Sequence, residues 1–149
     1  MNSTVKYQIV PAKKVNIDVL IKYKLNIILE YADDLDEKEI IQIKNYVNDI
    51  VPKLLKNYKV ILIDNNTVGS ILFYEKDDGI LLDEIYIEEK YRNCGIGTEI
   101  IKNILEDNFI VYLWVYKLNI KAIKLYKRLG FKINEETETR YHMKYIKQV

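Results

Sequence analysis

Two glycines separated by one residue, Gly95 and Gly97, lie between a strand-like run at 80–89 and an apolar helical pattern. The helical stripe is carried by Ile96, Ile100, Ile101, Ile104 and Leu105. A second strand-like run, 109–116, follows directly. Strand, helix and strand in this order predict a right-handed βαβ unit, in which the two strands are parallel. Because the run 109–116 is apolar throughout, we expect it to be buried on both faces, with Trp114 in the core.

The segments before this unit predict antiparallel strands and two helices. Runs at 58–64 and 67–75 flank the turn pair Asn65-Asn66, and the turn 76–79 leads into the run 80–89, so we expect a three-stranded meander. A short strand is expected at 7–10. Apolar residues at helical spacing predict one helix from Ile17 and a second that begins after Asp36. Asp36 and Glu39 have the spacing of a capping box, and Pro52 should kink or end the second helix.

The segments after the unit predict a third helix and two strands. The helix is expected over 119–129 and should close at Gly130 in a left-handed conformation. Strands are expected at 131–133 and 141–146. The pattern as a whole is that of an α/β protein with a mixed sheet. With 149 residues and no linker or repeat, we expect one domain over 1–149.

Composition and charge limit the classes of partner. Apolar residues make up 49% of the chain, charged residues 30%, and the formal net charge is +1. Such a balance gives no field that would attract nucleic acid or an anionic membrane. We find no signal peptide and no apolar stretch near the ~20 residues of a membrane helix, so we expect a soluble, cytoplasmic protein. The lone cysteine excludes an internal disulfide, and a metal site is not expected.

The glycine loop has the chemistry of a phosphate site. Glycines allow close backbone approach, and a helix begins there, so several N–H groups are free at a positive helix end. The nucleoside-triphosphate loop has no match in the chain, and the dinucleotide loop would require a glycine where Ile100 stands. A third pattern, Arg/Gln-x-x-Gly-x-Gly, is matched by Arg92, Gly95 and Gly97. The alternative is that the glycines only form a tight turn.

Two motifs, IYIEEKYRNCGIG and NIKAIKLYKRLGF, occur in that order with one helix and one strand between them. Here the chain resembles the GNAT superfamily of N-acetyltransferases over nearly its whole length. The resemblance implies a GNAT-like mixed, mostly antiparallel sheet with a splayed parallel strand pair, flanked by helices on both faces. It also implies acetyl-CoA as acetyl donor, bound where the two parallel strands splay apart.

The resemblance implies a set of cofactor-binding residues. Backbone groups of Ile85, Tyr86 and Ile87 would pair with the pantetheine arm as an added strand does. Asn119 would bond the same arm, and Tyr126 would lie beside it. The loop that would hold the pyrophosphate consists of Arg92, Asn93, Cys94, Gly95, Ile96, Gly97 and Thr98.

Acetyl transfer to an amine needs a base and an acid. Asp83 and Glu84 lie on the strand that enters the expected cleft, and either carboxylate could take a proton from the amine. Adjacent strand residues point to opposite faces, so only one should face the site unless a bulge intervenes. The resemblance favours Asp83, because its counterpart is the acid to which family members usually assign this role. The alternative is that both are surface acids. The resemblance makes Tyr126 the general acid for the leaving thiolate; the alternative is a core aromatic.

The expected reaction is transfer of acetyl from acetyl-CoA to a primary amine of a small molecule. The alternatives are acetylation of a protein N-terminus or lysine, and a non-catalytic acyl-CoA binding protein. Acids at the junction of the first two helices would suit a cationic acceptor such as a polyamine or aminoglycoside, although capping and solvated charge explain them more simply. They are Asp33, Asp34, Asp36 and Glu37.

Family members often dimerise through their C-terminal strands, so a homodimer is a further possibility for this chain. A mechanism through Cys94 and His142 lacks an orienting group.

Overall fold

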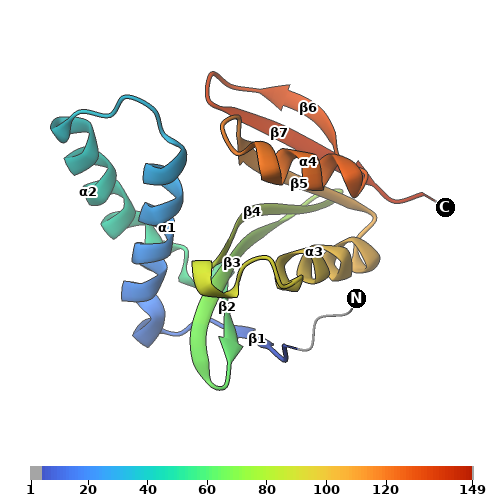
Figure 1. Ribbon diagram of the computed structural model, residues 1–149, viewed down its shortest axis with the longest axis horizontal. Coiled ribbons are helices and arrows are strands. Elements are labelled where there is room, and N and C mark those ends of the chain that lie inside the picture. Colours follow the sequence, from blue (N-terminus) through green and yellow to red (C-terminus); the bar gives the residue numbers. More distant parts are fainter. Residues whose placement is uncertain (1–4, 149) are drawn as a thin grey trace.

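The computed structural model describes residues 5–148, and these contain a single mixed sheet of seven strands (Figure 1). The strand order is β1-β2-β3-β4-β5-β7-β6, and every neighbouring pair is antiparallel except β4 and β5. The strands are β1 (Gln8–Pro11), β2 (Tyr58–Ile63), β3 (Asn66–Lys76), β4 (Gly79–Ile87), β5 (Ile110–Tyr116), β6 (Lys132–Glu136) and β7 (Arg140–Ile146). The predicted meander and the parallel pair with its intervening helix are confirmed.

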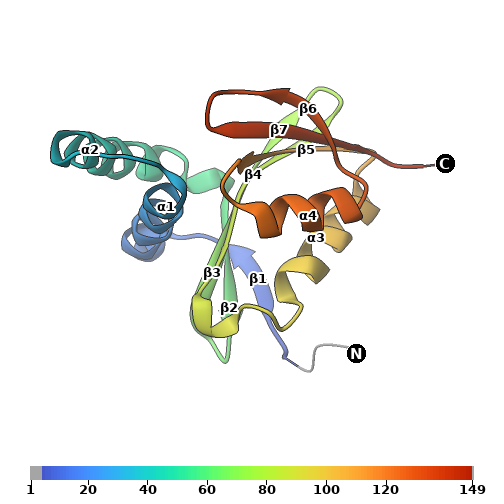
Figure 2. The same cartoon turned by 45° about the horizontal axis from the view of Figure 1, so that its top comes forward.

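Helices cover both faces of the sheet, as predicted (Figure 2). They are α1 (Ile17–Tyr31), α2 (Glu37–Lys53), α3 (Ile96–Asp107) and α4 (Ile120–Arg128), with short 3-10 turns η1 (Lys14–Asn16), η2 (Leu55–Asn57) and η3 (Glu89–Tyr91). Buried residues of α1 and α2 form one apolar cluster with β2 and β3, and those of α3 and α4 form a larger one on the opposite face. Among the described helices, none has the length and apolar character needed to cross a membrane.

The helix boundaries follow the expected capping signals. The Asp36 carboxylate accepts from Glu39 N at 2.8 Å, and Asp36 N donates to the Glu39 side chain at 3.2 Å, which is the predicted capping box. Helix α2 ends at Lys53, one residue after Pro52. Gly130 follows α4 with φ 107°, as expected for a left-handed residue after a helix. The turn between β2 and β3 is one residue earlier than predicted: Asp64 and Asn65 hold the two positive φ angles, and Asn66 begins β3.

The prediction that the fifth strand is buried on both faces is wrong. Val111, Leu113 and Val115 are buried under α3 and α4, whereas the alternate residues are only partly buried. The apolar cluster beneath α1 and α2 is built from strands on the other side of β4, so the second face of β5 lacks an equivalent cover. Trp114, expected in the core, lies on this more open face beside Arg140.

The parallel strands pair over only three positions and then separate. Pairing of β4 with β5 runs from Ile80↔Val111 to Leu82↔Leu113 and ends there, while β4 stays paired with β3 as far as Ile87. On the β3 side, the register moves from Phe73↔Leu82 to Leu72↔Glu84, so Asp83 is the extra residue of a bulge. The bulge and the end of the parallel pairing therefore coincide, and the splayed pair is confirmed.

At the other end of this pair, Gly79 allows β4 and β5 to approach closely. A Cβ at Gly79 would lie 2.1 Å from the Ile110 carbonyl oxygen, which is backbone and cannot rotate away. Gly79→Ala should therefore lower the free energy of unfolding by about 1–3 kcal/mol in urea titrations. Gly97→Ala is the matched control, because its Cβ would meet only the flexible end of Ile87 at 3.2 Å. Equal stability of the two variants would contradict the tight approach.

Candidate functional site

One edge of β4 is left without a strand partner beyond Leu82. Ile85, Tyr86 and Ile87 pair with Ile71, Ser70 and Gly69 of β3, but none of them pairs with β5. Backbone groups along such an edge need an external partner, which water or an extended ligand can supply. The three residues predicted to bind a pantetheine arm through their backbone thus have the strand geometry which that role needs.

The glycine loop forms the N-terminus of α3. Gly95 is the N-cap in a left-handed conformation, φ 88°, and it offers no side-chain cap. The first intrahelical bond runs from Glu99 N to Gly95 O, so the amides of Ile96, Gly97 and Thr98 precede the helical ladder. A positive helix end with uncapped amides suits an anionic group.

The rest of the loop is held by side-chain contacts. Asn93 also has a positive φ, 62°, and its carboxamide oxygen accepts from the Lys121 ammonium of α4. The Cys94 thiol donates to Tyr91 O at 2.8 Å, which favours a structural role for this cysteine. Arg92 Nε donates to the Ile87 carbonyl at 2.6 Å, and its guanidinium lies 5.1 Å from the centre of the Tyr86 ring. The cation of Arg92 is therefore fixed between the loop and the end of β4.

Helix α1 lies against the separated strand ends through its tyrosines. The Tyr23 ring stacks on Tyr86 at 4.6 Å, and its hydroxyl donates to Glu88 at 2.5 Å. One helical turn further, Asn26 donates to the Tyr86 hydroxyl at 3.1 Å. At the C-terminal end of α1, Tyr31 stacks on Tyr116 of β5 at 5.9 Å. Helix α1 thus contacts both β4 and β5 where they diverge.

The two candidate acids both lie on the α1 side of the sheet, because the bulge breaks the usual alternation. Glu84 is opposite Leu72, which belongs to the cluster under α1 and α2, whereas Leu82 belongs to the cluster on the other face. The charges of both Asp83 and Glu84 act on Tyr58 and Tyr74, which also lie on the α1 side. The expectation that only one acid faces this side holds only for regular strands.

The two acids differ in burial and in pairing. Glu84 is 8% exposed and forms an ion pair with Lys24 of α1 at 3.0 Å. Its second carboxylate oxygen is buried without a hydrogen-bond partner among residues 5–148. Burial raises the pKa of the Glu84 carboxyl, and the charge of Lys24 opposes that rise. Asp83 is more exposed and forms no ion pair within the described part of the chain.

Tyr126 lies on the other side of the separated strands, in the cluster under α3 and α4. It is 8% exposed, and its ring meets Phe131 edge-on at 5.7 Å. Burial, with a smaller contribution from Tyr31, raises the pKa of the Tyr126 phenol to about 12. Tyr126 is thus a buried phenol on the face of the sheet that α3 and α4 cover.

Asn119 is the N-cap of α4, and its carboxamide oxygen accepts from Ala122 N at 3.2 Å. Only its NH2 group is left to donate to a ligand.

The acidic residues at the junction of α1 and α2 have local structural roles. Asp36 and Glu39 form the capping box of α2, and Asp34 takes a positive φ of 52° in the turn between the helices. His142 stacks on Tyr112 and meets Trp114 edge-on. Within residues 5–148, no three His, Cys, Asp or Glu side chains are grouped to hold a metal.

Four residues of this site were missed from the sequence, namely Lys24, Tyr31, Tyr116 and Arg140. The first two lie on α1, and their contacts to β4 and β5 join segments more than 50 residues apart. Tyr116 and Arg140 are register partners, so they depend on the pairing of β5 with β7. The one available signal was position, since Tyr116 ends the strand that was expected to splay.

Comparisons with known proteins agree on one family. A family model described as the acetyltransferase (GNAT) family matches residues 27–131. Among curated proteins, spermine/spermidine N(1)-acetyltransferase of Bacillus subtilis is 32% identical over 69 residues, or 42% of this chain and 45% of the relative. An uncharacterized N-acetyltransferase of Methanocaldococcus jannaschii is 38% identical over 77 residues, or 48% of this chain and 33% of the relative. The matched parts therefore span less than half of these relatives.

Solved structures share the fold over nearly the whole chain. The paia N-acetyltransferase of Thermoplasma acidophilum, solved with coenzyme A, has a TM-score of 0.72 at 18% identity and covers 95% of this chain and 99% of its own. The apo form of YjaB from Escherichia coli has a TM-score of 0.75 at 18% identity, with 94% and 97% covered. At such identities the likeness establishes the fold alone.

The buried ion pair gives a stability prediction. Lys24→Met leaves the Glu84 carboxylate buried without a counter-charge, which should cost about 3–5 kcal/mol at neutral pH. The pKa of Glu84 would rise further above its ordinary 4.5 in the folded variant, so the loss should be small near pH 4.5 and should grow as the pH rises.

Urea titrations of the Lys24→Met variant across this pH range measure the effect, with Lys24→Met/Glu84→Gln as the matched control. The double variant carries neither charge and should recover most of the lost stability. A pH-independent loss in the single variant would show that packing of the lysine stem, rather than charge, is responsible.

Proposed function

The chain belongs to the GNAT family of acetyltransferases, and from this membership we propose that it transfers an acetyl group from acetyl-CoA to the primary amine of a small molecule. The observation that carries the proposal is the separation of β4 from β5 directly beside the uncapped N-terminus of α3. An extended arm and a diphosphate at its end would find matching backbone groups there.

The donor substrate would be held mainly by backbone. The open edge of Ile85, Tyr86 and Ile87 would pair with the amide groups of pantetheine, although the Ile87 carbonyl already accepts from Arg92. The amides from Gly95 to Thr98 would bind the diphosphate, with the Asn119 NH2 group as a further donor. Arg92, Asn93 and Cys94 would shape the loop through the contacts that they make in the structure.

The reaction needs the amine in its neutral form. An aliphatic amine with a pKa near 10.4 loses its proton at pH 7 at a cost of about 4–5 kcal/mol. We assign the proton acceptor to Asp83, acting directly or through water, because Asp83 is more exposed than Glu84 and has no ion-pair partner within residues 5–148. Glu84 is buried and paired with Lys24, so it would act on the acceptor only through its charge.

The leaving thiolate needs a hydrogen-bond donor. As the nitrogen attacks the thioester carbonyl, a C–N bond forms, the C–S bond breaks, and negative charge develops on sulfur. With its pKa raised to about 12, the Tyr126 phenol stays protonated at working pH and is available as that donor. Its burial also strengthens the hydrogen bond by excluding water.

A small acceptor fits the way α1 is anchored. Stacking of Tyr23 on Tyr86 and of Tyr31 on Tyr116 holds the helix against both strand ends, which favours a compact acceptor over a bound peptide. The relatives named for spermine and spermidine point to small amines as well.

Calorimetric titration with acetyl-CoA, beside NAD and ATP, tests the proposal. We expect selective binding of acetyl-CoA in the micromolar range, followed by thiol release when an amine panel is added. The matched variant Gly97→Ala should stay folded, because its Cβ would meet only the flexible end of Ile87. It should bind more weakly, because a side chain there would hinder close approach of the diphosphate to the loop backbone. A folded protein that binds no acetyl-CoA would overturn the proposal, and binding without thiol release would leave a non-catalytic acyl-CoA binding protein.

Tyr126→Phe tests the proposed acid. Removing the hydroxyl should lower kcat by about 10²-fold and leave acetyl-CoA affinity nearly unchanged, because the ring still packs on Phe131. Tyr112→Phe is the control: its hydroxyl bonds Asp78 at the paired end of the strands, so turnover should not change. Equal turnover of Tyr126→Phe and the native protein would remove Tyr126 from this role.

A further inference from the structure

Arg140, the first residue of β7, lies beside the end of β5. It is the register partner of Tyr116, and its guanidinium lies 4.6 Å from the Trp114 ring centre and 6.0 Å from the Tyr116 ring centre. Tyr116 alternates with the buried Val115, so these rings and Arg140 are on the face that carries Tyr31 of α1. A guanidinium therefore lies beside the end of β5, on the face of the sheet that α1 contacts.

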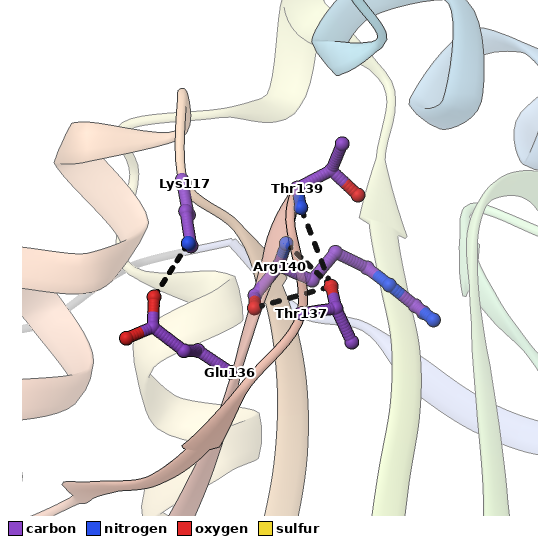
Figure 3. A network of polar contacts seen from close by, with 5 residues as sticks. All are labelled: Lys117, Glu136, Thr137, Thr139 and Arg140. Carbon is purple, nitrogen blue, oxygen red and sulfur yellow. Dashed lines mark hydrogen bonds and ion pairs between the residues drawn. The ribbon is translucent and has the colours of Figure 1, made fainter.

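The position of Arg140 is fixed by its backbone. Arg140 N and Thr139 N both donate to the Thr137 hydroxyl oxygen, at 3.0 and 3.3 Å (Figure 3). Thr137 N also donates to Arg140 O at 2.8 Å. The nearby Glu136 carboxylate is instead paired with Lys117 at 2.5 Å, and Figure 3 shows the Arg140 guanidinium pointing away from that pair. The turn therefore fixes the backbone of Arg140, while its carboxylate, that of Glu136, pairs with Lys117 and leaves the guanidinium charge uncompensated.

Stacking leaves the hydrogen-bonding groups of Arg140 free. The guanidinium carbon lies over the Trp114 and Tyr116 rings, and such a cation–π contact does not use the five N–H groups as hydrogen-bond donors. Among residues 5–148, no carboxylate forms an ion pair with Arg140. A guanidinium that is oriented, stacked and unpaired is suited to bidentate contact with a carboxylate or a phosphate.

Of the charged side chains near Tyr116, two form an ion pair with each other and two do not. Four charged side chains act on its hydroxyl, and their combined effect is smaller than that of burial, which raises the pKa of Tyr116; they are Arg140, Lys24, Glu84 and Asp83. Lys24 and Glu84 neutralise each other. Arg140 and Asp83 remain as one cation and one anion without ion-pair partners in the described chain.

We propose that Arg140 binds an anionic group of the acceptor, so that the acceptor is an amine that also carries a carboxylate or a phosphate. Its ammonium would lie toward Asp83 and its anion toward Arg140, on either side of Tyr116. This inference rests on the proposed acetyl transfer and narrows it, because a polyamine has no group for Arg140.

Binding of matched amines to the protein saturated with CoA tests the proposal without requiring turnover. The pairs are ornithine with 1,4-diaminobutane, which differ in a carboxylate, and phosphoethanolamine with ethanolamine, which differ in a phosphate. We expect the anionic member of at least one pair to bind tenfold or more tightly, and the pair concerned identifies the anion. Equal binding within both pairs would overturn the proposal.

Variants separate charge from packing. Arg140→Gln should abolish the preference for the anionic member of the pair, while Arg140→Lys should keep part of it. The matched control is Lys144→Gln, which removes a cation stacked on Tyr112 of the same face at the paired end of β5. Thermal melts verify folding of each variant. If the preference for the anionic amine survives in folded Arg140→Gln, or is lost equally in Lys144→Gln, it arises from the overall electrostatic potential of this face and the proposal is overturned.

Parallel thiol-release assays keep the two proposals distinct. Arg140-dependent binding of the anionic amine without thiol release would support the anion site and contradict acetyl transfer. Thiol release with the anionic amines at rates that Arg140→Gln does not change would support acetyl transfer and overturn the anion site.

Discussion

The separation of β4 from β5 after Leu82↔Leu113 is the constraint on which the rest of this structure depends. Backbone donors and acceptors inside a sheet are normally paired, so an edge opened in the middle of seven strands needs a compensating partner. Packing keeps it open: α1 contacts both strands from one face through stacked tyrosines, and α3 and α4 bury the alternate residues of β5 from the other. The sheet therefore offers strand-like hydrogen bonding to a ligand without the cost of opening itself on binding.

The bulge at Asp83 connects this backbone feature to the charges. By adding one residue to β4 relative to β3, it turns Asp83 and Glu84 toward the same face of the sheet. Two carboxylates on one face repel each other, and the Lys24 ammonium offsets one of them. A buried pair of this kind adds little net stability, because desolvation cancels most of the attraction. Its effect is to leave Asp83 as the carboxylate without an ion-pair partner among residues 5–148.

Most of the fold could be predicted because its signals are local. The cap at Asp36, the left-handed Gly130 and the glycines before α3 are requirements of a few consecutive residues, and each was found where the sequence indicated. The wrong predictions concern features that depend on contacts between segments far apart in the sequence. β5 looks like a doubly buried strand because it is apolar, but burial of its second face depends on how far α1 and α2 extend. The relation of Asp83 to Glu84 depends on the register with β3, which alternation alone does not reveal.

The sequence by itself determined the family, through the resemblance carried by its two motifs, and the order of the elements, because both depend on residues close together along the chain. The loop and strand proposed to meet the donor also came from that resemblance. Only the tertiary structure decided how the side chains near the strand ends are charged and paired. Lys24 reaches Glu84 from 60 residues away, and Arg140 reaches Tyr116 across a strand register. Such contacts follow from the packing of helices on a sheet and from strand pairing, and a single sequence carries no local signal for either.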